Sequence, residues 1–127
     1  MLVVPALYGG PDEGVWEWNG EQWRRSEAIG PSRRQTYGLA YDPRAQRVVL
    51  GGGQGGSRGP YHDDFWSWDG RTWTKWPTLA EGPVGRGGGN LLFDHDRNRF
   101  IYFGGYDTGP LRDLWVFSGG AWTRMDR

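Results

Sequence analysis

Three consecutive polar residues are the first candidates for chemistry in this sequence. His62, Asp63 and Asp64 carry the side chains of a metal pair or of an acid–base group. The chain contains two histidines, so a metal ion here needs ligands from elsewhere, such as His95. No arrangement of Ser, His and Asp indicates a nucleophile. We therefore predict neither catalytic residues nor a metal site.

Two further segments imitate ligand-binding loops. Residues 94–98 read Asp-His-Asp-Arg-Asn, like the start of a calcium loop, but Arg99 and Gly105 stand where that loop needs Gly and Glu. The glycine-rich run 85–90 lacks the following helix and the Gly-Lys-Ser/Thr of a phosphate loop. Cysteine is absent, which excludes disulfides and thiol chemistry. We expect turns in both places and no cofactor.

Charge and hydropathy exclude other functions. Lys and Arg number 15, as do Asp and Glu, and this balance argues against a nucleic-acid partner. No apolar run approaches the roughly 18 residues of a membrane span, and residues 1–10 lack the features of a signal peptide. We expect a soluble protein without a membrane partner, and its compartment stays open.

Aromatic residues and glycines are unusually frequent. The 127 residues include 23 Gly and 9 Trp, while hydrophobic residues make up 36%. This length suits one domain. A core of large flat side chains between glycine-rich turns is expected, without helices or disorder.

Two sequence patterns recur with a period of about 50 residues. Trp23, Trp73 and Trp122 end three similar tryptophan-rich segments, 50 and 49 residues apart. A second unit, 30–53, recurs as 82–105 with an offset of 52. Independent patterns that share one period predict a repeat architecture.

Each repeat is predicted to contain four antiparallel strands. In the first tryptophan segment, a two-residue turn at 19–20 places Trp18 opposite Glu21 and Trp16 opposite Trp23. Alternation then places Trp16, Trp18 and Trp23 on one face of the sheet. The equivalent pairs are Trp66 with Trp73 and Trp115 with Trp122. The preceding strand pairs are 38–41 with 47–50 and 90–93 with 99–103.

These features together resemble the kelch repeat, whose fold is a β-propeller blade. The residues that carry the resemblance are the diglycines 9–10, 52–53 and 104–105, Asp64 with Trp66, Asp113 with Trp115, and Trp23, Trp73 and Trp122. Residues 41–50 are similar to the bacterial kelch-like type. Gly14 stands where the first unit should have Asp, which predicts a looser start of its third strand.

The resemblance implies an all-β propeller portion that covers residues 1–127. Blade 1 is partial and spans 1–25, blade 2 spans 30–76, and blade 3 spans 82–125. Closed propellers contain about 4 to 8 blades, so three cannot close a ring. We predict a homodimer that completes a six-blade ring. The alternative is that the sequence is part of a longer propeller.

The longer, dissimilar loops should emerge at one end of the propeller, and such loops usually carry recognition. Arg beside Tyr and Trp suits carboxylate-bearing peptides or glycans. Trp76 is expected to be the best exposed aromatic side chain. The predicted ligand-binding residues are Arg33, Arg34, Tyr37, Arg58, Tyr61, His62, Trp76, Arg86, Tyr106 and Arg112.

The function expected from this reading is non-catalytic binding by a self-assembling module that recognises a protein or a small molecule. Two alternatives remain open. The first is a sugar-processing enzyme of the isomerase or lyase type, which uses a His or Arg at the channel mouth. The second is a carbohydrate-binding lectin. Fold alone does not choose among them.

Overall fold

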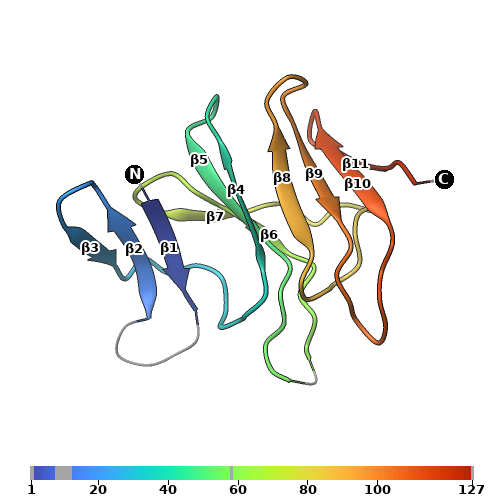
Figure 1. The fold of residues 1–127 in the computed structure, drawn as a ribbon, viewed down its shortest axis with the longest axis horizontal. Helices are drawn as coiled ribbons and strands as arrows, with labels where there is room; N and C mark the ends of the chain where they lie inside the picture. The colour runs from blue at the N-terminus through green and yellow to red at the C-terminus, as the bar shows by residue number, and fades with distance from the viewer. Residues whose placement is uncertain (1, 8–12, 58, 127) are drawn as a thin grey trace.

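The computed structural model describes residues 2–7, 13–57 and 59–126, in which eleven β-strands and no helix occur (Figure 1). The strands form three antiparallel sheets, which we name blades 1, 2 and 3. Blade 1 consists of β1 (Leu2–Ala6), β2 (Gly14–Trp18) and β3 (Trp23–Ser26). Blade 2 consists of β4 (Gly38–Asp42), β5 (Arg47–Gly51), β6 (Phe65–Trp68) and β7 (Trp73–Lys75). Blade 3 consists of β8 (Asn90–Asp94), β9 (Arg99–Phe103), β10 (Leu114–Ser118) and β11 (Ala121–Arg124).

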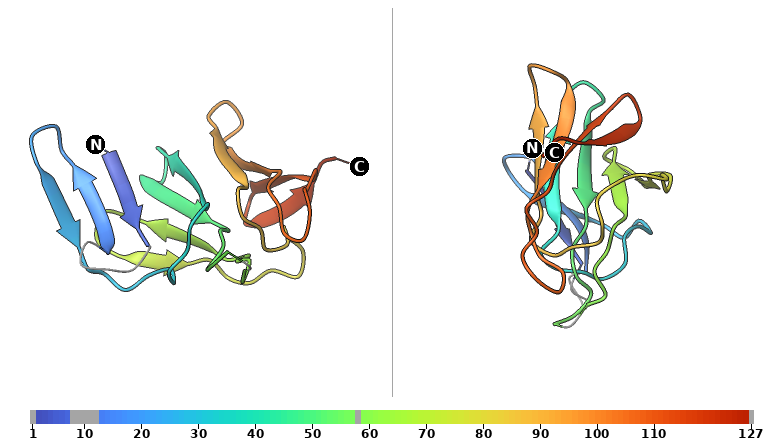
Figure 2. Two further views of the ribbon diagram at one scale, coloured as in Figure 1. Left: turned by 60° about the horizontal axis from the view of Figure 1, so that its bottom comes forward. Right: turned by 90° about the vertical axis from the view of Figure 1, so that its right-hand side faces the viewer.

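The blades lie side by side along the long axis of the molecule, with blade 2 in the middle (Figure 2). Within each blade, strands that follow one another in the chain are hydrogen-bonded neighbours. The predicted all-β class and propeller-like blades are confirmed, and the first blade has three strands. The blades form an open arc (Figure 1). The described residues include no helix that is long and apolar enough to cross a membrane.

The tryptophan hairpins reverse one residue later than the sequence predicts. Trp18 pairs with Trp23, not with Glu21, so the predicted register is wrong by two residues. The cause is Asn19, whose Oδ1 accepts hydrogen bonds from the backbone N–H groups of Glu21 and Gln22, both at 2.9 Å. Asn19 therefore precedes the turn, and its side chain stabilises the turn by accepting these hydrogen bonds. The corresponding pairs in blades 2 and 3 are Trp68 with Trp73 and Phe117 with Trp122.

The tryptophan side chains nevertheless lie on the predicted face of the sheet. A register shift of two residues preserves the alternation of side chains, so Trp16, Trp18 and Trp23 share one face of blade 1. Gly20 suits this turn because it adopts a φ of 101°, in the left-handed region that other residues rarely adopt.

An aspartate begins the turn between the first two strands of blade 2 and of blade 3. These turns lie at 42–46 and 94–98, as the sequence predicts. Asp42 Oδ1 accepts hydrogen bonds from the backbone N–H groups of Arg44 and Ala45, at 3.0 and 3.2 Å. Asp94 Oδ1 accepts a hydrogen bond from the N–H group of Arg97 at 3.3 Å. Both aspartates serve as turn caps.

The hydrophobic core lies between the blades. One cluster joins blades 1 and 2, and a second joins blades 2 and 3. The first cluster consists of Leu7, Val15, Val48, Leu50, Trp68 and Trp73. The second consists of Val49, Phe65, Leu91, Phe100, Tyr102, Trp115 and Trp122. Blades 2 and 3 therefore each pack their tryptophan-bearing face against the blade before them.

Candidate binding site

Arg34 is fixed inside the fold. It is buried, and its Nη1 and Nη2 donate to the two carboxylate oxygens of Asp64 at 2.7 and 3.1 Å. Its remaining N–H groups donate to Ser32 and to the carbonyl of Gly52. All five guanidinium donors therefore have protein partners, and Arg34 has none left for a ligand.

Arg86 makes the same arrangement in blade 3. Its side chain is fully buried and donates to both carboxylate oxygens of Asp113 at 2.5 and 2.7 Å. The indole N–H of Trp115 also donates to Asp113, at 2.7 Å. The hydrogen bonds from Arg86 lower the pKa of Asp113 below its usual value. Arg86 thus holds the start of β10 rather than facing a ligand.

Burial and hydrogen bonding oppose each other at Asp64. Burial of the carboxylate alone would raise its pKa, but hydrogen bonds from Arg34 and Trp66 outweigh this effect and lower the pKa to about 2. Gly14, the first residue of β2, occupies the position that corresponds to Asp64. Blade 1 therefore lacks the carboxylate of this cluster.

Trp76 lies between blades 2 and 3, so the prediction that it is the best exposed aromatic side chain is wrong. Its ring stacks on Phe65 and Phe117 at centroid distances of 5.6 and 4.5 Å. The guanidinium of Arg47 lies 5.1 Å from the ring. Its indole N–H donates to the hydroxyl of Ser67. Sequence reasoning missed this because Trp76 follows β7 and has no aromatic equivalent in the other repeats.

The other predicted residues are spread over the end of the molecule that carries the long loops. Arg33 and Arg112 are exposed. Tyr37 is half-buried, and its hydroxyl donates to the carbonyl of Pro5 at 2.5 Å. Arg58 lies outside the described residues, as do the glycines at 9–10.

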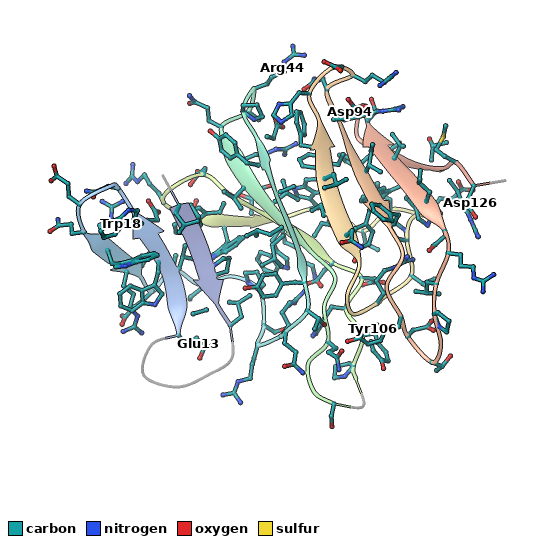
Figure 3. All side chains as sticks on the ribbon, in the orientation of Figure 1. Glu13, Trp18, Arg44, Asp94, Tyr106 and Asp126 are labelled. Carbon is teal, nitrogen blue, oxygen red and sulfur yellow. The ribbon has the colours of Figure 1, made fainter. Side chains whose placement is uncertain are left out.

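Three predicted residues come together on this loop end. Tyr106 lies at this end of the molecule (Figure 3). Its ring meets that of Tyr61 edge to face at 6.2 Å, and its hydroxyl donates to the side-chain oxygen of Gln54. His62 follows Tyr61, and its Nε2 is buried without a hydrogen-bond partner among the described residues. Burial, and then the charge of Arg34, lower the pKa of His62 below its usual value.

A cleft on the opposite side of the molecule is lined by side chains of two blades. It lies between blades 1 and 2, has a volume of about 670 Å³, and opens toward the short turns. Its apolar lining includes Val3, Leu39, Tyr41, Val48 and Trp68. Its polar lining includes Glu17, Arg24, Asp69 and Arg71. This volume is within the range of about 300–1,000 Å³ that is typical of ligand sites.

Glu17 is the unusual residue of this cleft. Its carboxylate is buried, accepts a hydrogen bond from the Trp68 indole at 3.2 Å, and lies 3.5 Å from the guanidinium of Arg24. The strand pairings place Ser67 and Val116 at the equivalent positions of blades 2 and 3. An alignment of the three repeats would therefore have singled out Glu17, because the other two repeats have Ser and Val at its position.

Comparison with known proteins gives no family. No protein-family model matches the chain, and a search of the curated proteins finds no relative. Within the described residues, His, Asp and Glu form no group of three that could hold a metal ion. The proposed function therefore rests on the geometry of the molecule itself.

Proposed function

We propose that the chain is a kelch-like half of a β-propeller, which assembles with a second copy and acts as a non-catalytic binding module. The observation that carries this proposal is the exposure of apolar side chains on the two outer faces of the arc. Equivalent side chains between the blades are buried or half-buried.

The outer face of blade 1 bears tryptophans that have no blade before them. Trp23 is 47% exposed and Leu2 is 53% exposed. Their equivalents in blade 2, Trp73 and Val48, are each 9% exposed because they pack against blade 1. The outer face of blade 1 is thus chemically the same kind of face that blades 2 and 3 bury.

The outer face of blade 3 also exposes apolar side chains. Leu92 and Met125 are each 52% exposed, and Phe103 is 37% exposed. The blade 2 residues equivalent to Leu92 and Met125 are Ala40 and Trp76, which pack against blade 3. A second copy, related by a twofold axis, would bury both outer faces by the contacts already used between blades. Two sets of three blades make six, within the range of closed propellers.

The absolute mass in solution, measured by light scattering on a sizing column over a dilution series, tests this assembly. We expect a sharp mass near twice 14.4 kDa for the wild type. Trp23→Glu places a charge in the proposed interface and should give a monomer. Ile29→Glu is the matched control, because Ile29 is 95% exposed in the connection between blades and should not affect the mass. A monomeric wild type, a heterogeneous aggregate or a dimeric Trp23→Glu variant would each contradict the proposal.

The sugar-processing and lectin alternatives gain no specific support from the geometry. The lectin alternative relied on an exposed Trp76, but this ring is packed between Phe65 and Phe117. A Trp76→Ala variant would therefore report on stability rather than on glycan binding. The enzyme alternative still predicts loss of turnover in a His62→Ala variant that folds.

A further inference from the structure

The first blade has an open sheet edge beside the cleft. In blades 2 and 3, the second strand is flanked on both sides: β5 lies between β4 and β6, and β9 lies between β8 and β10. Among the described strands, β1 pairs with β2 alone. The cleft therefore lies where the innermost strand of blade 1 would be.

The neighbouring strand β4 of blade 2 exposes apolar side chains toward this position. Leu91 of blade 3 is 5% exposed because β8 packs against β4. Its equivalent Leu39, on β4, is 38% exposed, and Tyr41 is 51% exposed. Both side chains line the cleft with Val3. An apolar side chain opposite Val3 would cover them.

The backbone of β1 is open over a short stretch. The Tyr37 hydroxyl donates to the carbonyl of Pro5, so this carbonyl points away from β2. Alternate residues of a strand direct their backbone groups to the same side, so the N–H and C=O groups of Val3 also point to the open edge. Pro5 has no N–H group, which limits pairing at the loop end of the edge. Val3 therefore keeps both of its backbone groups for pairing at this edge, whereas those of Leu2 and Val4 point toward β2.

The charges at the turn end of the cleft suit an acidic residue. Arg71 is exposed, and the side chain of Arg24 is 75% exposed. The two carboxylates beside them are already used. Glu17 accepts a hydrogen bond from Trp68 and lies 3.5 Å from one terminal nitrogen of Arg24, whose other N–H groups have no hydrogen bond to it. Asp69 accepts two hydrogen bonds from its own turn. The guanidinium groups therefore keep donors for an incoming carboxylate, with which they form strong hydrogen bonds.

The chain itself contains the pattern that fits such a position. β4 and β8 are the innermost strands of their blades, and each has an apolar residue followed two positions later by Asp: Ala40 and Asp42, Leu92 and Asp94. Residues two apart lie on the same face of a strand, which for these strands is the face toward the next blade.

We propose that this cleft binds an extended peptide of another protein, with an apolar residue and an acidic residue two positions later. The peptide runs antiparallel to β1 and adds a strand to blade 1. Its apolar side chain contacts Val3, Leu39 and Tyr41. Its carboxylate receives hydrogen bonds from Arg24 and Arg71.

A fluorescent peptide with the sequence of residues 89–95 is a direct probe, and its binding is followed by fluorescence anisotropy. We expect saturable binding to the wild type. Leu39→Ser in the protein, or Leu92→Ser in the peptide, should weaken binding by about tenfold or more because an apolar contact is lost. Leu79→Ser is the matched control, since Leu79 is 40% exposed outside the cleft lining. It should bind the peptide like the wild type.

The electrostatic part has its own readout. Arg71→Ala in the protein and Asp94→Asn in the peptide should each weaken binding and reduce its dependence on salt. Absence of saturable binding to the wild type would overturn the proposal, and so would equal affinity for the Leu39→Ser variant. Peptide binding that dissociates a dimer would also overturn it, because the second copy would then occupy the cleft.

This inference is independent of the proposed assembly, since the cleft is formed within one chain. Trp23→Glu should change the mass and leave peptide binding intact. Leu39→Ser should do the reverse. Failure of either proposal is therefore recognised without the other.

Discussion

Replacement of Asp113 by Asn should destabilise the protein more than any change at an exposed ion pair. Arg86 is fully buried, and Asp113 accepts hydrogen bonds from both of its terminal nitrogens and from Trp115. Asparagine retains the size of the side chain but removes the charge and turns an N–H group toward a donor. Arg86 is then a buried cation without its counter-ion.

The magnitude follows from burial. Removal of one partner of a buried ion pair costs about 3–5 kcal/mol, against a total free energy of unfolding of about 5–15 kcal/mol for a domain. At about 4 °C per kcal/mol, the melting temperature should fall by about 12–20 °C. Urea unfolding followed by tryptophan fluorescence measures the free energy, and calorimetry measures the temperature.

The matched control is Asp126→Asn. Asp126 also accepts two hydrogen bonds from an arginine, Arg124, but both residues are exposed, so the change should be small. A double variant, Arg86→Met with Asp113→Leu, should regain part of the lost stability because no unpaired charge remains. Equal stability of Asp113→Asn and Asp126→Asn would refute the reasoning.

Two further predictions concern ionisation and a buried hydroxyl. The pKa of Asp64 is lowered to about 2 in the folded state, against about 4 in the unfolded state. The stability that ionised Asp64 contributes is therefore complete above about pH 4 and is lost as the pH falls toward about 2. The free energy of unfolding in urea should depend less on pH across this range in Asp64→Asn than in the wild type. The Tyr102 hydroxyl is buried without a hydrogen-bond partner among the described residues, and burial raises its pKa to about 12. Tyr102→Phe should therefore retain stability, whereas Tyr37→Phe should lose about 1 kcal/mol because the bond to the Pro5 carbonyl disappears; a loss in Tyr102→Phe larger than that in Tyr37→Phe would contradict this assignment.

The strand content was predictable because it depends on local signals. The tryptophan period, the alternation and the glycine turns are visible in the sequence, and they led to the correct strands. The register was not predictable from turn residues alone. Asn19 suits either a turn position or a cap before the turn, and the hydrogen bonds of its side chain decide between them.

The binding residues were harder to predict than the fold. Arg34 and Arg86 were predicted to bind a ligand, although they are 52 residues apart, which is one repeat and is typical of a structural role. Their partners Asp64 and Asp113 are distant in sequence, so the pairing became visible in the structure. The cleft could not be predicted from motifs, because it lies beside a free sheet edge of the described part of blade 1 and is not defined by a sequence pattern.

The difference between the two outer faces has a consequence for assembly. In the proposed assembly, each outer face packs against the opposite face of another copy and not against itself, so copies would add head to tail. Such contacts produce either a closed ring or an unlimited filament. Rings grow by three blades per copy, and six is the only multiple of three between 4 and 8. In the proposed ring, the three blades of each chain would thus limit the assembly to two chains.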